Sequence, residues 1–284
     1  MPKDGDGMMT DGDLASQNPS GGPAGESGTM PGRTAMDEFL RGHDAVAPRG
    51  ALARLFGASP LTAETRPLFN AAVGEIEVGD DLDALGDGWR VVHAVPVGAD
   101  NTDIDHLVVG PGGVFIINTK YYSGLNVWVS QRTFVVAGIR YPHVRNMEYE
   151  MGRVERLLAT AVGRPVEVSG VLAVVNPRTL TVRQQHRDVA VVPSADLPGW
   201  LKAHRQRLGC AEVENIAAAA RLDSTWHEGT HVRATAADVR ARFDEVRAGV
   251  RSAWRLQVFW ATIITAVGAG GFVVLTYAIF LNAL

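Results

Sequence analysis

The residues most able to do chemistry lie in one stretch, 103–120, that predicts a β-hairpin. Two strongly apolar segments, 104–109 and 114–117, flank the turn signal Gly110-Pro111-Gly112-Gly113. Strands that are apolar on both faces belong at the centre of a covered sheet. Polar side chains occur only at the open end of this hairpin. There a carboxylate, a carboxamide, a second carboxylate and an ammonium group would form a site.

These four groups belong to Asp105, Asn118, Asp103 and Lys120. When the two valines nearest the turn pair with each other, Asp105 faces Asn118 and Asp103 faces Lys120. Side chains alternate along a strand, so all four should lie on one face of the sheet. Asp103 either adds a carboxylate to the site or forms an ion pair with Lys120 one step further out.

Length and composition limit the size of the domain and the kinds of site that the chain can form. The chain has 284 residues, a formal net charge of −4 and 46% hydrophobic residues. That is enough for one good-sized core with appendages. A net charge this small does not decide whether the partner is a nucleic acid. The single cysteine, Cys210, excludes an intrachain disulfide and a zinc site built from several cysteines.

The elements that must position the site follow the order of an α/β domain. Apolar residues recur at helical spacing in some segments, whereas short apolar runs elsewhere are typical of strands. The sequence therefore predicts one mixed sheet flanked by helices. The predicted helices are 66–85, 144–162 and 197–208, and the predicted strands are 90–95, 104–109, 114–117, 126–129, 133–136, 168–175 and 189–192.

The regions outside this domain differ in character. Residues 1–50 are predicted to be a disordered tail, because 1–31 is rich in Gly, Asp, Ser, Pro and Met and lacks an apolar segment. Residues 235–255 predict an amphipathic basic helix whose apolar stripe runs from Val239 to Trp254. This stripe either packs against the domain or lies on a membrane surface.

A transmembrane helix is predicted over 256–281. No charged residue occurs in 256–284, and a membrane span needs roughly 20 apolar residues. Arg247, Arg251 and Arg255 precede this stretch, and nothing basic follows it. By the positive-inside rule, we expect a single-pass protein of the cell membrane whose N-terminal domain is cytoplasmic.

Several blocks in a fixed order carry a family resemblance. They are Gly74-Glu75, Trp89-Arg90-Val91-Val92-His93, the hairpin 103–120 and Val127-Trp128-Val129. This series resembles the NERD family, the nuclease-related domain, over a core of 66–178, with 179–225 as a C-terminal extension of the α/β domain. The resemblance implies the fold of the PD-(D/E)xK nucleases, which is a restriction-endonuclease-like mixed sheet flanked by helices. It also implies a nucleic-acid phosphodiester as substrate.

The resemblance implies a role for each of four residues. Glu75 matches the helix glutamate, Asp105 the strand aspartate and Lys120 the lysine of the final motif, whereas Asn118 stands where such nucleases carry Asp or Glu. Asp105 would be the principal ligand of Mg²⁺ or Mn²⁺ and Glu75 the second. Lys120 would stabilise hydroxide or the negative charge that develops on the phosphate. The neutral Asn118 removes one formal charge from this set.

Three further residues are candidates for binding nucleic acid. Tyr121 follows Lys120 and either stacks on a base or packs at the sheet edge. Arg140 and Arg145 lie close to the start of the helix 144–162, where each either contacts a phosphate or pairs with helix-surface carboxylates such as Glu148 and Glu150.

Two functions remain open at this point. In the first, the chain is a membrane-anchored nuclease-related protein that binds nucleic acid and hydrolyses it with a divalent metal. In the second, it is a catalytically degenerate module that binds nucleic acid or protein as a scaffold at the cytoplasmic membrane face. Purely structural roles also exist for the charged residues: Glu75 as a buried partner for an arginine, and Asp105 with Lys120 as an ion pair at the sheet end.

Overall fold

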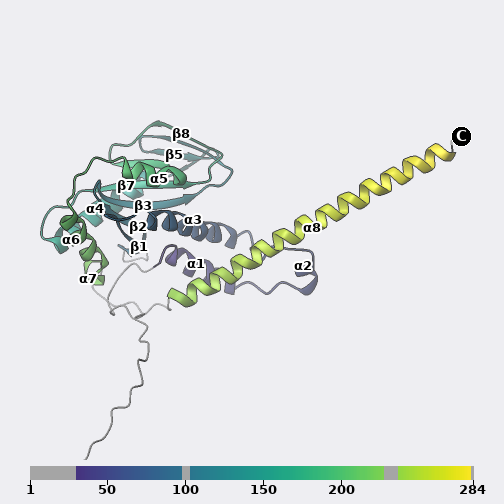
Figure 1. The fold of residues 1–284 in the computed structure, drawn as a ribbon, viewed down its shortest axis with the longest axis horizontal. Helices are drawn as coiled ribbons and strands as arrows, with labels where there is room; N and C mark the ends of the chain where they lie inside the picture. The colour runs from purple at the N-terminus through teal and green to yellow at the C-terminus, as the bar shows by residue number, and fades with distance from the viewer. Residues whose placement is uncertain (1–29, 98–102, 227–235, 283–284) are drawn as a thin grey trace, which may run out of the picture.

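The fold is built around a mixed five-stranded sheet in the order β1-β2-β3-β7-β9 (Figure 1). The structure is a computed structural model that describes residues 30–97, 103–226 and 236–282, with the backbone alone for 268–282. β2 pairs antiparallel with both β1 and β3, whereas β7 pairs parallel with β3 and β9 pairs parallel with β7. Their bounds are β1 (Arg90–Pro96), β2 (Asp103–Gly110), β3 (Gly113–Tyr121), β7 (Val168–Val175) and β9 (Val189–Pro193).

A second sheet stands apart from the first, which corrects the prediction of one sheet. Its order is β6-β5-β4-β8, and its strands are β4 (Asn126–Ser130), β5 (Thr133–Val136), β6 (Ile139–Tyr141) and β8 (Thr179–Gln184). β4 alternates buried with exposed side chains, so only one of its faces meets the core. β8 lies in a stretch for which the sequence predicts no strand. Its Leu180 and Val182 pack on the core.

Helices cover both faces of the central sheet. On one face, α3 (Thr65–Asp83) and the short α5 (Leu197–Lys202) pack against apolar residues of β2, β3 and β7. On the other face lie α4 (His143–Val162), α6 (Cys210–Arg221) and α7 (Asp223–Trp226). The 310 turn η1 (Ser194–Asp196) leads into α5. The predicted α/β domain is thus confirmed as a layered arrangement of sheet and flanking helices.

The N-terminal region contains ordered helices, so the prediction of a disordered tail over 1–50 is wrong for its second part. α1 (Arg33–Asp44) buries Met36, Phe39 and Leu40, which recur at helical spacing. α2 (Ala51–Leu55) follows it. The predicted tail residues 1–29 lie outside the described residues.

A single helix, α8 (Ala236–Asn282), spans both segments that the sequence predicts as separate helices. The ring of Phe243 lies 5.6 Å from that of Phe39 and 5.3 Å from that of Phe69, measured between centroids. Val239 is buried in the same cluster, whereas Trp254 is exposed. The first part of the apolar stripe therefore packs against the domain, which is one of the two alternatives that the sequence offered.

The predicted transmembrane helix over 256–281 is not supported. Among the residues that the structure describes, no helix combines the length and the apolar character that crossing a membrane requires. The described side chains of α8 end at residue 267 and include the charged stretch up to Arg255. The remainder of the predicted span lies outside the described side chains.

The packed rings of Phe39, Phe69 and Phe243, called here the aromatic cluster, should hold α8 against the domain. Phe243→Ala should lower the free energy of unfolding by about 3–5 kcal/mol, because it empties a fully buried aromatic site. Trp254→Ala, on the same helix but 65% exposed, is the control and should change the free energy by less than about 0.5 kcal/mol. Urea denaturation measures both. Equal effects of the two variants would show that α8 is not held by this cluster.

Candidate functional site

The candidate site lies where β2 separates from β3. The predicted register is confirmed near the turn, where Val109 pairs with Val114, and the backbone pairing of β2 with β3 ends at His106 and Ile117. Beyond that point, side chains replace the backbone as hydrogen-bond partners between the two strands. The backbone N–H of Thr119 donates to Asp105 Oδ2 at 2.5 Å.

Three carboxylates approach this point from three elements: Glu75 from α3, Asp105 from β2 and Glu150 from α4. Burial raises the pKa of Glu75 well above its usual value, and the charge of Asp105 raises it further, while Lys120 partly offsets both. Burial also raises the pKa of Asp105, and Lys120 and the Thr119 backbone N–H oppose that rise. The site therefore concentrates negative charge around one ammonium group.

A glycine lets α3 bring Glu75 so close. A Cβ at Gly74 would lie 3.1 Å from Cδ2 of Tyr121 and 3.3 Å from Cγ2 of Thr119. Both distances are tighter than ordinary van der Waals contact. The helix therefore rests almost directly on the end of β3, and Glu75, the next residue, is carried to the sheet edge.

Lys120 is not used in a structural ion pair. Within the described residues, its ammonium group makes no hydrogen bond and no ion pair within 4.0 Å, so the alternative of an Asp105–Lys120 ion pair is not formed. Asp103 accepts a hydrogen bond from the Thr34 hydroxyl of α1 instead of pairing with Lys120. Lys120 is half-buried and faces the carboxylates without being bound to one.

Asn118, the residue that departs from the acidic pattern, is held by two hydrogen bonds. Its Oδ1 accepts from the backbone N–H of Asp105 at 3.3 Å, and its Nδ2 donates to Glu150 Oε2 at 2.7 Å. The two bonds fix which end of the carboxamide points where, because only the oxygen can accept from a backbone N–H. Asn118 thereby joins β2 to α4.

Glu150 is a site residue that sequence reasoning missed. The sequence assigned it to the surface of its helix, whereas the structure places it half-buried against Asn118. One signal was present: Glu150 comes three residues after Met147 and four before Val154, and both of these are buried. That spacing puts Glu150 at the margin of the helix face that packs on the sheet.

His143, the first residue of α4, is a second site residue that the sequence did not indicate. Its Nε2 lies 2.7 Å from the hydroxyl of Tyr122, and its ring stacks on Tyr141 with centroids 5.2 Å apart. Burial and the nearby charge of Lys120 lower the pKa of His143 to about 4. A neutral imidazole therefore closes this side of the site at neutral pH.

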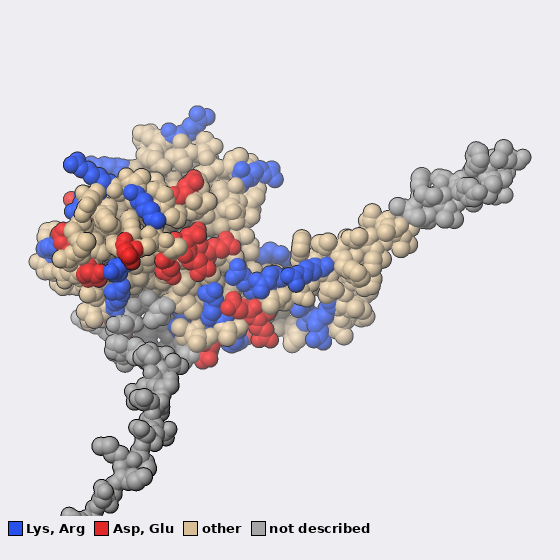
Figure 2. Space-filling view, in the orientation of Figure 1, with Lys and Arg blue, Asp and Glu red and all other residues tan. Residues whose placement is uncertain are grey.

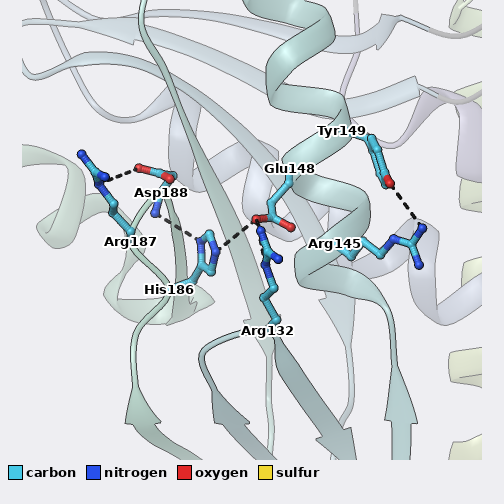
Figure 3. A network of polar contacts seen from close by, with 7 residues as sticks. All are labelled: Arg132, Arg145, Glu148, Tyr149, His186, Arg187 and Asp188. Atoms are coloured by element: carbon cyan, nitrogen blue, oxygen red, sulfur yellow. Dashed lines mark hydrogen bonds and ion pairs between the residues drawn. The ribbon is translucent and has the colours of Figure 1, made fainter.

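The three predicted nucleic-acid contacts lie around the site in different settings. Tyr121 is half-buried and packs toward Gly74. Arg140 is exposed on β6, where its guanidinium donates to the Thr133 hydroxyl at 3.1 Å. Arg145 is exposed on α4 and donates to the hydroxyl of Tyr149 at 3.2 Å (Figure 3). The role of these residues toward nucleic acid stays a prediction.

A cavity of about 750 Å³ lies elsewhere on the molecule. It is lined by Ser169 and Gly170, near the start of β7, and by Glu148, His186 and Asp188. The carboxylate of Glu148 accepts from Arg132 at 2.7 Å and lies 3.1 Å from His186 (Figure 3). Ion pairing thus accounts for Glu148, and the cavity is separate from the carboxylates that surround Lys120.

The donor set suits a hard divalent cation in its chemistry. All the acidic donors are carboxylate oxygens, which Mg²⁺ and Mn²⁺ prefer over nitrogen and sulfur. Among the described residues, no three His, Cys, Asp or Glu side chains lie close enough together to hold a metal ion. The predicted ligands Asp105 and Glu75 would therefore hold a cation as a pair, with water or substrate phosphate completing its shell, as Mg²⁺ commonly accepts.

Comparisons with known proteins bear on the domain that carries this site. Residues 71–175 match the model of the NERD family, described as nuclease-related domain, which confirms the resemblance found in the sequence. Curated proteins give no match. A solved structure, SfsA of Pyrococcus furiosus in complex with Ca²⁺, is 17% identical over 54% of this chain and 53% of that chain, with a TM-score of 0.19. This chain thus spans about half the length of SfsA, and a TM-score this low does not establish a shared fold.

The raised pKa of Glu75 makes a prediction about stability. We expect Glu75→Gln to be more stable than the wild type at pH 7 without divalent cations, because it removes a charge that burial disfavours. The folded chain holds its proton more tightly than the unfolded chain does. The wild type should therefore lose stability relative to the variant as pH rises from about 4.3 through the raised pKa, with no difference at lower pH.

Thermal unfolding across this pH range provides the measurement. Glu64→Gln is the control, because a hydrogen bond with Thr62 lowers the pKa of exposed Glu64. The wild type should gain stability relative to this variant as pH rises through the lowered pKa toward about 4.3, and the difference should stay constant above that pH. A Glu75→Gln variant less stable than the wild type at pH 7 would contradict the burial of a destabilising charge.

Proposed function

We propose that the domain is a metal-dependent nuclease that hydrolyses phosphodiester bonds of nucleic acid. The match of residues 71–175 to a nuclease-related domain supports a nucleic-acid substrate. The observation that carries the proposal is Lys120, a half-buried ammonium group that faces carboxylates of raised pKa without an ion pair among the described residues. Burying such a group without a structural partner is costly, so a substrate phosphate is its natural partner.

Each residue has a defined part in this proposal. Asp105 and Glu75 would hold a divalent cation, which when bound neutralises phosphate charge and supplies hydroxide near neutral pH. The Thr119 backbone N–H orients the Asp105 carboxylate. Lys120 stabilises the negative charge that develops on the phosphate in the transition state. His143, neutral at neutral pH, bonds the Tyr122 hydroxyl and stacks on Tyr141, so it adds no charge on the side of the site that faces β6.

A second function has one observation in its favour. The oxygen of Asn118 is committed to the backbone of Asp105, so position 118 offers neither a charge nor a free ligand. A domain with a weakened cation site would bind nucleic acid or protein without cutting. Such binding would depend strongly on salt, because it would rest on phosphate contacts by residues such as Arg140 and Arg145.

Lys120→Ala separates these two functions. If the domain is a nuclease, the variant should cleave nucleic acid about 10²–10³-fold more slowly than the wild type, because one stabilising charge is lost from the transition state. Cleavage of labelled DNA and RNA with Mg²⁺ or Mn²⁺ measures this. Lys202→Ala, at the exposed end of α5, is the control and should retain full activity.

Two results would contradict the nuclease proposal. Cleavage that persists unchanged in both Lys120→Ala and Asp105→Asn would come from another site or another protein. A wild type that binds nucleic acid in a salt-dependent manner and never cleaves it would establish the binding module instead.

We also propose that the chain acts at the cytoplasmic face of the cell membrane. α2 lies beside α8: the indole N–H of Trp260 donates to the Leu55 carbonyl at 2.9 Å, and the rings of Phe56 and Trp260 lie 5.4 Å apart. Large apolar side chains on both helices are exposed, Leu52 and Phe259 among them. Basic side chains gather along the part of α8 beside this surface (Figure 2). Exposed apolar groups next to arginines suit an anionic lipid surface.

Co-sedimentation with vesicles tests this placement. The full chain should pellet with phosphatidylserine vesicles more than with phosphatidylcholine vesicles, and added salt should weaken the difference. Leu52→Ser with Phe56→Ser should reduce the pelleted fraction without lowering the melting temperature, because both side chains are exposed. Equal pelleting with both lipids, or no effect of the substitutions, would exclude α2 as a lipid contact.

A further inference from the structure

We infer that Glu150 supplies, from α4, the carboxylate that position 118 lacks in β3. The inference rests on the proposed function, because it concerns the same cation site. It assigns to Glu150 an electrostatic part in holding the cation, through the shell around the ion, because the described carboxylates do not converge tightly enough for three of them to ligate it. It also makes Asn118 a positioning residue. The negative charge of the site is then relocated from the strand to the helix rather than lost.

The first support is the chain of contacts that links Glu150 to the hairpin. Glu150 Oε2 accepts from Asn118 Nδ2 at 2.7 Å, and Asn118 Oδ1 accepts from the backbone N–H of Asp105 at 3.3 Å. One side chain therefore separates Glu150 from the principal predicted ligand. Position 118 is buried, so the carboxylate that it holds is also fixed in place.

The second support is that Glu150 has no structural ion pair. Among the described residues, its only hydrogen bond is to the neutral amide of Asn118, and no cation lies within 4.0 Å of it. Glu148, two residues earlier on the same helix, behaves differently and pairs with Arg132 and His186 (Figure 3). A half-buried carboxylate without a cationic partner is unfavourable for stability, which points to a use that the folded chain alone does not supply.

The third support is that Glu150 lies within the electrostatic field of the site. Burial raises its pKa, the Asn118 hydrogen bond and the charge of Lys120 lower it, and the charge of Asp105 raises it. Glu150 is thus near enough to both Lys120 and Asp105 to interact with each. Because three carboxylates do not converge tightly in the described residues, Glu150 would act on a cation by its charge and through the shell around it.

Moving the negative charge from position 150 to position 118, with side chains of nearly unchanged shape, tests the inference. The full chain is compared as wild type, Glu150→Gln, and the double variant Asn118→Asp with Glu150→Gln. In the double variant, the carboxylate introduced at position 118 can accept from both the amide introduced at position 150 and the Asp105 backbone N–H. Both hydrogen bonds therefore survive with the charge moved into β3. Glu148→Gln is the matched control on the same helix.

Isothermal titration with Mg²⁺ and with Mn²⁺ is the primary readout. We expect Glu150→Gln to weaken cation binding about tenfold or more, the double variant to recover the affinity of the wild type, and Glu148→Gln to leave it unchanged. Cleavage rates should follow the same order. Circular dichroism and melting temperatures confirm that each variant is folded, which the retained hydrogen bonds favour.

The outcomes separate this inference from the proposed function. A wild type that binds neither cation overturns the proposed function. A wild type that binds a cation, with equal affinity in Glu150→Gln, overturns the inference alone. A folded double variant that binds as weakly as Glu150→Gln also overturns it, because restoring the charge at position 118 would then not compensate for its loss at position 150.

Discussion

The parallel pairing of β3 with β7 holds the end of β3 in place beyond the point where its pairing with β2 stops. β3 remains bonded to β7 as far as Tyr121, whereas its pairing with β2 ends at Ile117. Backbone groups at the end of the hairpin are thus free to bond side chains, and Thr119 uses its N–H to orient Asp105. The end of β3 is unpaired on its β2 side, so its pairing with β7 is what keeps Asn118 and Lys120 in register. The candidate site is therefore a product of incomplete strand pairing on a well-supported strand.

Concentrating carboxylates at this point has a cost for the folded state. The pKa values of Glu75, Asp105 and Glu150 are all raised, with burial as the largest cause in each case. A hydrophobic core of the usual kind covers both faces of the sheet and supplies the stability that such a site requires. The positive φ of Ala94, on β1 between the residues that pair with His106 and Ile104, adds local backbone strain beside Asp105. Both features are typical of places where function opposes stability.

Much of the central fold could be predicted from sequence, because its signals are local. The hairpin register follows from the Gly-Pro-Gly-Gly turn and the apolar runs around it, and β7 stands out as a continuous apolar segment. What escaped prediction depends on distant partners. α1 follows a Gly-rich stretch, and its buried Phe39 packs on residues distant in sequence, Phe69 of α3 and Phe243 of α8. Glu150 carries no special pattern of its own, and its importance follows from where α4 crosses Asn118. The predicted metal ligands and nucleic-acid contacts stay predictions.

The close contact of Gly74 with the end of β3 determines how such a site can change. The distance between Glu75 and the sheet edge is set by the absence of a single methyl group rather than by any polar interaction. A Cβ at this position would press on the side chains of Tyr121 and Thr119, so these side chains or α3 would have to move by a few tenths of an ångström. A larger residue at position 74 therefore acts on the position of Glu75 by steric contact alone, with every polar side chain of the site still present.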